Sequence, residues 1–364
     1  MNTTFETEED RTKALGVWSA IAAGGGAFGL ILGGVITDVF SWPWVFFVNI
    51  PIGIATFILS LRLIPESKDE HEHKGFDLRG AVFVTAGLIA LVYAIVRTNT
   101  VGWISVETFL VGGLALVLLL LFVRTERRAA EPLVRLSIFR VPTLRAANIV
   151  LLLVISGLFA MFFFNSLYVQ RVLGYSPLKA GLAFLPFTAG IVIGAGLAQQ
   201  GIARIGLRTT AIIGLAIAAA GMFWLLRLGV DGAYLPDLLP SVLPVSIGMG
   251  LAFVALTLIA TGGLPSEDAG LASGLYNTSQ QIGGALGLAI LSTIATSRTN
   301  DALAAAGPHV SSSEHANALV HGFIGAFAGA AVFVAAGGVL LMILLRPSDL
   351  EAISTDRPVT VAAA

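Results

Sequence analysis

Ten long stretches of this chain contain no Asp, Glu, Lys or Arg, and this pattern constrains the fold more than any other feature. The stretches are residues 14–37, 39–61, 80–96, 108–123, 146–170, 180–203, 209–226, 238–266, 269–297 and 316–345. About 20 apolar residues cross the ~30 Å hydrocarbon core of a bilayer as a helix. Backbone polar groups in lipid must pair within the chain, so such stretches form helices or the shorter, alternating strands of a closed barrel. Their length and uniform apolar character therefore predict an all-α polytopic membrane protein with ten transmembrane helices.

The composition supports this prediction and argues against several classes of function. Hydrophobic residues make up 56% of the chain and charged residues 12%, against about 25% charged residues in a soluble domain. A net charge of −1 gives no reason to expect a nucleic-acid partner. His71 and His73 lie in an acidic run typical of a solvated loop, and the chain has neither Cys nor a phosphate-binding loop pattern. The predicted spans hold no catalytic cluster, so we expect no metal, no cofactor and no enzymatic activity.

The basic residues indicate the orientation in the membrane. With a cytoplasmic N-terminus, 16 of the 21 Lys and Arg residues fall in inner loops and chain ends, and 5 fall in outer loops. Cytoplasmic loops carry the excess of basic residues in membrane proteins. The sequence therefore predicts a multi-pass protein of the cell membrane with both termini in the cytoplasm.

Two charged loops divide the predicted helices into three blocks. Residues 65–80 follow the second helix, and the basic segment 124–145 follows the fourth and includes an amphipathic piece expected on the inner membrane surface. The expected organisation is two helices in 1–64, a helix pair with flanking cytoplasmic loops in 65–145, six helices in 146–346 and a cytoplasmic tail, 347–364.

The first predicted helix carries a dense glycine pattern, formed by Gly16, Gly25, Gly29, Gly33 and Gly34. Residues four positions apart share a helix face, so Gly25, Gly29 and Gly33 form a smooth surface that another helix can approach closely. The spacing G-x8-G-x3-G-L-x2-G-G resembles the antiporter signature in the fifth helix of major facilitator drug exporters. The segment FSWPWVFFVNIPIGI that follows at 40–54 resembles the start of the sixth helix in the 14-helix drug:proton antiporter family of the major facilitator superfamily.

A second segment, residues 248–290, resembles helices 12 and 13 of the same family and includes a short inner loop, LPSEDAG. This segment combines small residues with amides at membrane depth. Its glycines are expected to allow close helix packing. They are Gly270, Gly274, Gly283, Gly284 and Gly287.

Amide side chains at membrane depth are the candidates for a substrate cavity. Uncompensated polar groups there are unfavourable, so each amide either hydrogen-bonds a neighbouring helix or lines a wet cavity. The candidates are Asn148, Asn165, Gln170, Asn277, Gln280 and Gln281. Phe162, Phe163 and Phe164 lie beside Asn165, and because three consecutive residues cannot all face inward, at least one ring is expected to meet lipid. An aromatic, amide-lined cavity suits bulky lipophilic substrates.

The resemblance implies a major facilitator fold and proton-coupled efflux of drugs or other small lipophilic compounds, with a small-molecule substrate and protons as partners in a lipid bilayer. Aligned by its motifs, the chain supplies helices 5–14 of the family pattern and lacks the first four. Residues 1–64 then correspond to a remnant of the N-terminal half, 65–145 to the central pair and 146–346 to the C-terminal half.

The missing helices bear on the expected activity. The family's coupling carboxylate lies in the first helices, whereas the acids nearest to the predicted spans here, Asp38, Glu107 and Asp237, lie at helix ends. We therefore expect a truncated form that does not transport alone. The alternative is a non-transporting membrane scaffold or regulatory fragment.

The purified chain in liposomes is expected not to accumulate a lipophilic cationic dye in response to a transmembrane pH gradient, because coupling requires a titratable group within the membrane. Dye fluorescence in vesicles with and without the gradient measures this. Robust gradient-driven uptake would show that the chain holds its own coupling group.

Overall fold

The computed structural model describes residues 25, 28–29, 31–63, 77–129, 132–262, 266–307 and 309–350 of the 364-residue chain. This part consists of helices, short 3₁₀ and π turns and their connections, and it contains no strand. Residues 31–39 are helical and lead through a turn to α2 (Trp44–Phe47) and α3 (Asn49–Leu63). The elements that follow are α4 (Leu78–Val101), α5 (Val106–Glu126), η1 (Leu136–Arg140), α6 (Pro142–Leu167), η2 (Tyr168–Val172), α7 (Pro177–Ala183), α8 (Leu185–Ile205), α9 (Leu207–Trp224), η3 (Leu225–Arg227), η4 (Tyr234–Leu238), α10 (Leu239–Thr261), α11 (Ser266–Ala306), α12 (Ser312–Leu344) and η5 (Pro347–Leu350).

The predicted all-α membrane fold is confirmed. Among the described residues, eight helical segments are long and apolar enough to cross a membrane. They are Trp44–Leu63, Leu78–Thr98, Val106–Glu126, Pro142–Val172, Pro177–Ile205, Leu207–Arg227, Tyr234–Thr261 and Ser312–Leu344. The predicted span 269–297 lies within α11, the most polar of the long helices, which is not among the eight. The predicted span 14–37 lies mostly outside the described residues.

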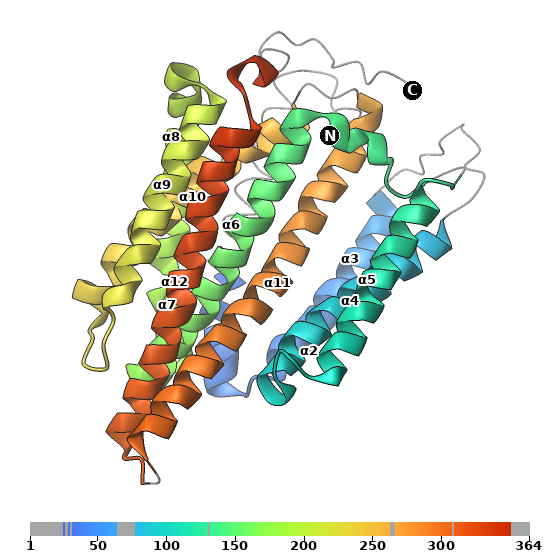
Figure 1. The fold of residues 1–364 in the computed structure, drawn as a ribbon. Coiled ribbons are helices and arrows are strands. Elements are labelled where there is room, and N and C mark those ends of the chain that lie inside the picture. The colour runs from blue at the N-terminus through green and yellow to red at the C-terminus, as the bar shows by residue number, and fades with distance from the viewer. Residues whose placement is uncertain are drawn as a thin grey trace.

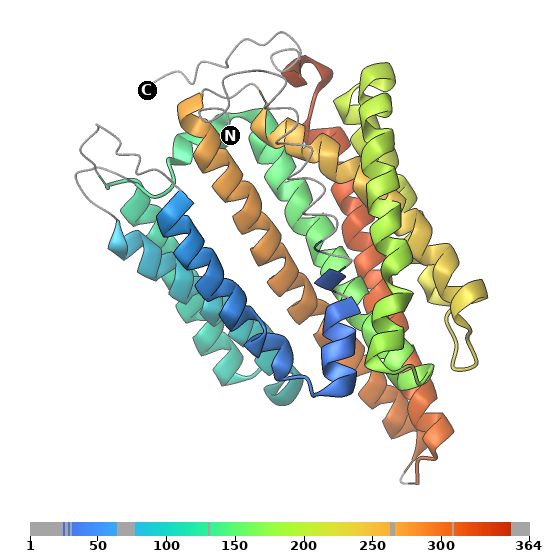
Figure 2. The ribbon, with the colours of Figure 1, turned by 180° about the vertical axis from the view of Figure 1, so that it is seen from behind.

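The described helices form two groups (Figure 1, and from behind in Figure 2). α6 and α8 to α12 make one bundle, and α3, α4 and α5 lie on the other side of α11. α4 and α5 pack against each other along their length, and α11 is the bundle helix that contacts α4. The division into an N-terminal block, a central pair and a six-helix block stays a prediction.

The connections alternate between the two ends of the bundle, as they must in a chain that crosses a membrane repeatedly. The α4–α5, η3–η4 and α11–α12 connections lie at one end (Figure 1). η1, the α8–α9 junction and the start of α11 lie at the opposite end. In the predicted orientation the first end faces outward and the second faces the cytoplasm.

α6 is the central helix of the six-helix bundle. In its most apolar stretch, 67% of the residues are buried, whereas none of those in the Trp44–Leu63 span is. The core around α6 combines its own Met161 with large side chains from neighbouring helices, such as Met222, Met249 and Phe327. The main buried core of the described residues therefore lies in the bundle of α6 and α8 to α12.

Glycines let the backbone of α10 lie in direct contact with the backbones of its two neighbours, α8 and α9. A Cβ added to Gly248 would lie 2.6 Å from the backbone nitrogen of Ala218 on α9. A Cβ on Gly250 would lie 2.8 Å from the backbone nitrogen of Ala195 on α8. Helices in lipid gain little from the hydrophobic effect and associate through close contact of this kind.

The α11 glycines behave in two ways. Gly283 and Gly287 lie against the backbone of α6, and Gly284 lies against a side chain of α6, Phe159. The Ser156 hydroxyl adds a hydrogen bond to the carbonyl of Gly283 at 2.8 Å. By contrast, a Cβ on Gly270 or Gly274 would meet no described atom within 4 Å. The close packing predicted for this segment therefore occurs in its second half.

The segment expected to lie on the membrane surface packs against protein. Ile138 of η1 is 2% exposed and clusters with Val141, Leu144 and Ala272, the last of these on α11. Part of the apolar side of this segment is therefore covered by the start of α11, and its position at the inner membrane surface stays a prediction.

Gly250→Ala is expected to lower the thermal stability of the purified protein, because its methyl group would meet backbone atoms that cannot move independently. Overpacking of this kind costs about 1–3 kcal/mol, more than the roughly 1 kcal/mol that alanine gains over glycine in a helix. Gly196→Ala on the neighbouring α8 is the matched control, since no described atom lies within 4 Å of its Cβ position. Equal melting temperatures for the two variants would contradict the proposed contact.

Candidate functional site

A groove of about 370 Å³ lies between the first described helical residues and the corner formed by α6, η2 and α7. We call it the glycine groove. Its lining residues are Gly29, Gly33, Gly34, Thr37, Val45, Phe162, Ser166, Gln170, Pro177, Ala180, Gly181 and Phe184. The groove brings together two features that were predicted separately, the antiporter-type glycines and one of the cavity amides.

The glycines of the signature have different surroundings. A Cβ on Gly34 would lie 2.9 Å from the Cα of Leu178 at the start of α7, so only a glycine allows this approach. At Gly25, Gly29 and Gly33, no described atom lies within 4 Å of the Cβ position. Gly29 and Gly33 therefore line the groove, and the close contact lies at Gly34. Gly16, the first glycine of the pattern, lies outside the described residues.

Aromatic rings form the wall opposite the glycines. The ring of Phe162 stacks on Phe184 with 5.4 Å between centroids, and it meets Phe187 edge-on at 4.4 Å. Offset and edge-to-face pairs of this kind are favourable beyond the area that they bury. One wall of the groove is thus a surface of aromatic rings that are held in place by packing on one another.

The next two phenylalanines point elsewhere, as three consecutive residues on a helix must. Phe163 is 42% exposed on the outside of the bundle, whereas Phe164 is buried against Phe323 and Phe327 of α12. This arrangement agrees with the expectation that at least one of the three rings faces away from the protein interior.

Gln170 and Ser166 supply the polar part of the groove. The side-chain nitrogen of Gln170 donates a hydrogen bond of 2.8 Å to the hydroxyl of Ser166. Gln170 lies in η2, a π turn that widens the end of α6. Such turns often occur at functional sites. The sequence identified the amide but gave no sign of the π turn that carries it.

Asp38 lies at the end of the first described helix and contacts the start of α7. Its carboxylate accepts hydrogen bonds from the hydroxyl of Ser176 and the backbone N–H of Leu178, both at 3.2 Å. Together with the approach at Gly34, these bonds hold the end of the first helix against the start of α7. Sequence reasoning noted Asp38 only as an acid at a helix end.

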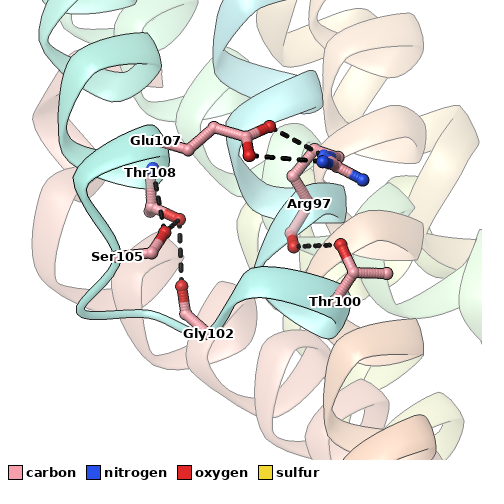
Figure 3. A network of polar contacts seen from close by, with 6 residues as sticks. All are labelled: Arg97, Thr100, Gly102, Ser105, Glu107 and Thr108. Carbon is pink, nitrogen blue, oxygen red and sulfur yellow. Dashed lines mark hydrogen bonds and ion pairs between the residues drawn. The ribbon is translucent and has the colours of Figure 1, made fainter.

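The other acids near the spans are also engaged with the protein. Glu107 forms a bidentate ion pair with Arg97, with its carboxylate oxygens 2.8 and 3.2 Å from two guanidinium nitrogens (Figure 3). Asp237 accepts the backbone N–H of Ala233 at 2.7 Å. Neither carboxylate belongs to the glycine groove, whose described lining residues are all uncharged.

Asn148 and Asn165 lie inside the bundle and not on a groove. Asn148 donates to the carbonyl of Leu144 and accepts from the hydroxyl of Ser279 on α11, both at 2.8 Å. Asn165 is fully buried, and its nitrogen lies 2.8 Å from the sulfur of Met161. For Asn148, the structure favours interhelical hydrogen bonding, the alternative considered for these amides.

The three α11 amides lie away from Gln170. Asn277 is exposed and donates to the carbonyl of Ser273 on its own helix, and Gln280 is half-buried. Gln281 lines a second groove of about 540 Å³ between α4 and α11. Its other lining residues are Leu88, Ile89, Val92, Tyr93, Val96, Ile282, Ala285 and Leu286. Of the predicted cavity amides, Gln170 and Gln281 therefore line different grooves, Asn148 and Asn165 lie in the bundle interior, and Asn277 and Gln280 line neither groove.

Known proteins resemble this chain over most of its length. Residues 2–288 match the profile of the Major Facilitator Superfamily. The cephamycin export protein CmcT of Amycolatopsis lactamdurans is 38% identical over 349 residues, which are 94% of this chain and 69% of that protein.

Two further relatives are a puromycin resistance protein and a multidrug resistance protein. Pur8 of Streptomyces alboniger is 34% identical over 95% of this chain and 68% of its own length. Stp of Mycobacterium tuberculosis is 32% identical over 80% of this chain and 53% of its own length. With its multi-pass helical fold, the chain belongs to the Major Facilitator Superfamily and is a membrane transporter of that type.

Proposed function

We propose that this chain acts in the efflux of small lipophilic compounds, including antibiotics, and that the glycine groove is part of the substrate path. The observation that carries the proposal is the lining of this groove, where aromatic rings face glycines and a single amide–hydroxyl pair. Relatives named for cephamycin export and puromycin resistance support the substrate class.

The chemistry of the groove favours substrates with a large apolar body and few polar groups. Phe162 and Phe184 offer flat contact area, and Ser166 and Gln170 offer uncharged hydrogen-bonding groups. Because none of the described lining residues is charged, these residues do not select the substrate by its charge. Such a surface accepts varied compounds, as a broad exporter must.

We further propose that protons supply the energy and that both termini face the cytoplasm. The glycine pattern resembles the signature of drug:proton antiporters, and no phosphate-binding loop pattern is present to suggest ATP as the source. The 16 to 5 distribution of basic residues supports the orientation. In this proposal, residues 1–64 belong to the N-terminal half, 65–145 form the central pair, and 146–346 form the C-terminal half.

Phe162→Ala is expected to weaken binding of a lipophilic dye to the detergent-purified chain about tenfold, because it removes the ring that faces the groove. Phe163→Ala is the matched control, since the ring of Phe163 lies outside the bundle. Fluorescence polarisation of the dye measures both affinities. Equal losses in the two variants would contradict the groove, and no saturable binding by the unmodified chain would favour the non-transporting scaffold.

Gly33→Leu and Gly34→Leu are expected to act in different ways although they are adjacent. Leucine at Gly33 has space and fills the groove, so dye binding falls while the melting temperature is retained. Leucine at Gly34 collides with the backbone of α7, so the melting temperature falls. Dye titration and thermal unfolding of both variants test this prediction. A lower melting temperature for Gly33→Leu together with an unchanged one for Gly34→Leu would contradict it.

A further inference from the structure

Two carboxylates meet where the central helix pair begins and ends. Asp77 is the N-cap of α4, and its Oδ1 accepts the backbone N–H of Gly80 at 2.8 Å. Glu126 is the last residue of α5, and its Oε2 accepts the backbone N–H of Val134 at 3.0 Å. Each acid thus uses one oxygen to hold a backbone group.

The remaining oxygen of each acid points to a common place. The Oδ2 of Asp77 and the Oε1 of Glu126 lie 2.6 and 2.8 Å from the point where a Cβ of Gly80 would be. Both oxygens are inaccessible to water, and neither has a hydrogen-bond partner within the described part of the chain. Glu126 as a whole is only 4% exposed.

Among the described residues, no basic side chain forms an ion pair with either acid. The described basic groups of the surrounding elements are the guanidinium groups of Arg79, Arg124, Arg127, Arg128 and Arg135. All five side chains are exposed, and among the described residues the only one of them in an ion pair is Arg135, which binds Asp268. Two adjacent carboxylates whose facing oxygens are buried, with no described counter-charge, are strongly unfavourable when both are ionised.

One proton shared by the two acids removes this conflict. A carboxylic acid donates one hydrogen bond, and a facing carboxylate accepts it, so both unpartnered oxygens become satisfied. A metal ion would need further oxygen ligands, and the described residues offer no third acid at this place. We propose that Asp77 and Glu126 share one proton and form a protonation site at the end of the central helix pair. This site is independent of the proposed efflux.

The site is linked to the six-helix bundle. Val134, whose N–H holds Glu126, precedes Arg135, and Arg135 pairs with the largely buried Asp268 near the start of α11. A chain of direct contacts therefore runs from the start of α4, through the end of α5, to α11. Loss of the shared proton would place two negative charges next to each other at the contact between Asp77 and Glu126.

Infrared spectroscopy tests the proposal on the purified full chain near neutral pH, where exposed carboxyl groups are ionised. The unmodified protein is expected to show the C=O stretching band of a protonated carboxylic acid. Glu126→Gln and Asp77→Asn are each expected to lose that band, because either amide supplies the missing donor and leaves a carboxylate alone. Asp231→Asn, in an exposed loop, is the control that keeps the band. No band in the unmodified protein, or a band that survives both substitutions, would overturn the proposal.

Thermal unfolding gives a second readout with a defined sign. The folded chain holds a proton that the unfolded chain releases near neutral pH, so its free energy of unfolding falls as the pH rises. Between about pH 6 and about pH 9, the melting temperature of the unmodified protein should fall by about 2–4 °C more than that of Glu126→Gln. Parallel curves would contradict the shared proton. A rise in melting temperature on adding Mg²⁺, absent in Glu126→Gln, would show a metal site instead.

Discussion

Close backbone contact between helices is the constraint on which the rest of this structure depends. In lipid, apolar side chains gain little by leaving their surroundings, so helices associate where small residues let their backbones meet. Gly248 and Gly250 place α10 between α8 and α9, and Gly283 and Gly287 place α11 against α6. The same rule at Gly34 positions the first helix against α7 and so forms one edge of the glycine groove. The site is therefore a product of helix packing.

The helices and the family could be predicted from the sequence, because charge-free stretches and ordered motifs report directly on a bilayer. The roles of single amides could not be predicted in this way. In a helix that is apolar on every side, the pattern does not reveal which face turns inward. Asn148 and Gln170 therefore looked equivalent, yet one bridges two helices and the other lines a groove. The π turn at the end of α6 also has no signature in the sequence.

The contacts made by acids in the loops and at the helix ends were the hardest to predict from the sequence. Asp77 and Glu126 belong to charged loops in the sequence, where a carboxylate is usually solvated. Only the fold shows that Glu126 is buried and that Gly80 leaves room for both side chains to converge. Asp38 is a similar case, since its partners lie about 140 positions further along the chain. Long-range pairs of this kind follow from the packing of helices and not from local patterns.

The three consecutive phenylalanines of α6 have a mechanical consequence. Within a single turn, Phe162 faces the groove, Phe163 faces outward and Phe164 is locked between rings of α12. These rings share one rigid backbone segment, so none can rotate about the helix axis without the others. The fit of Phe164 in the core therefore sets the angle at which Phe162 meets a bound molecule. A shift of α12 would therefore move Phe164 and, with it, the Phe162 ring that lines the glycine groove.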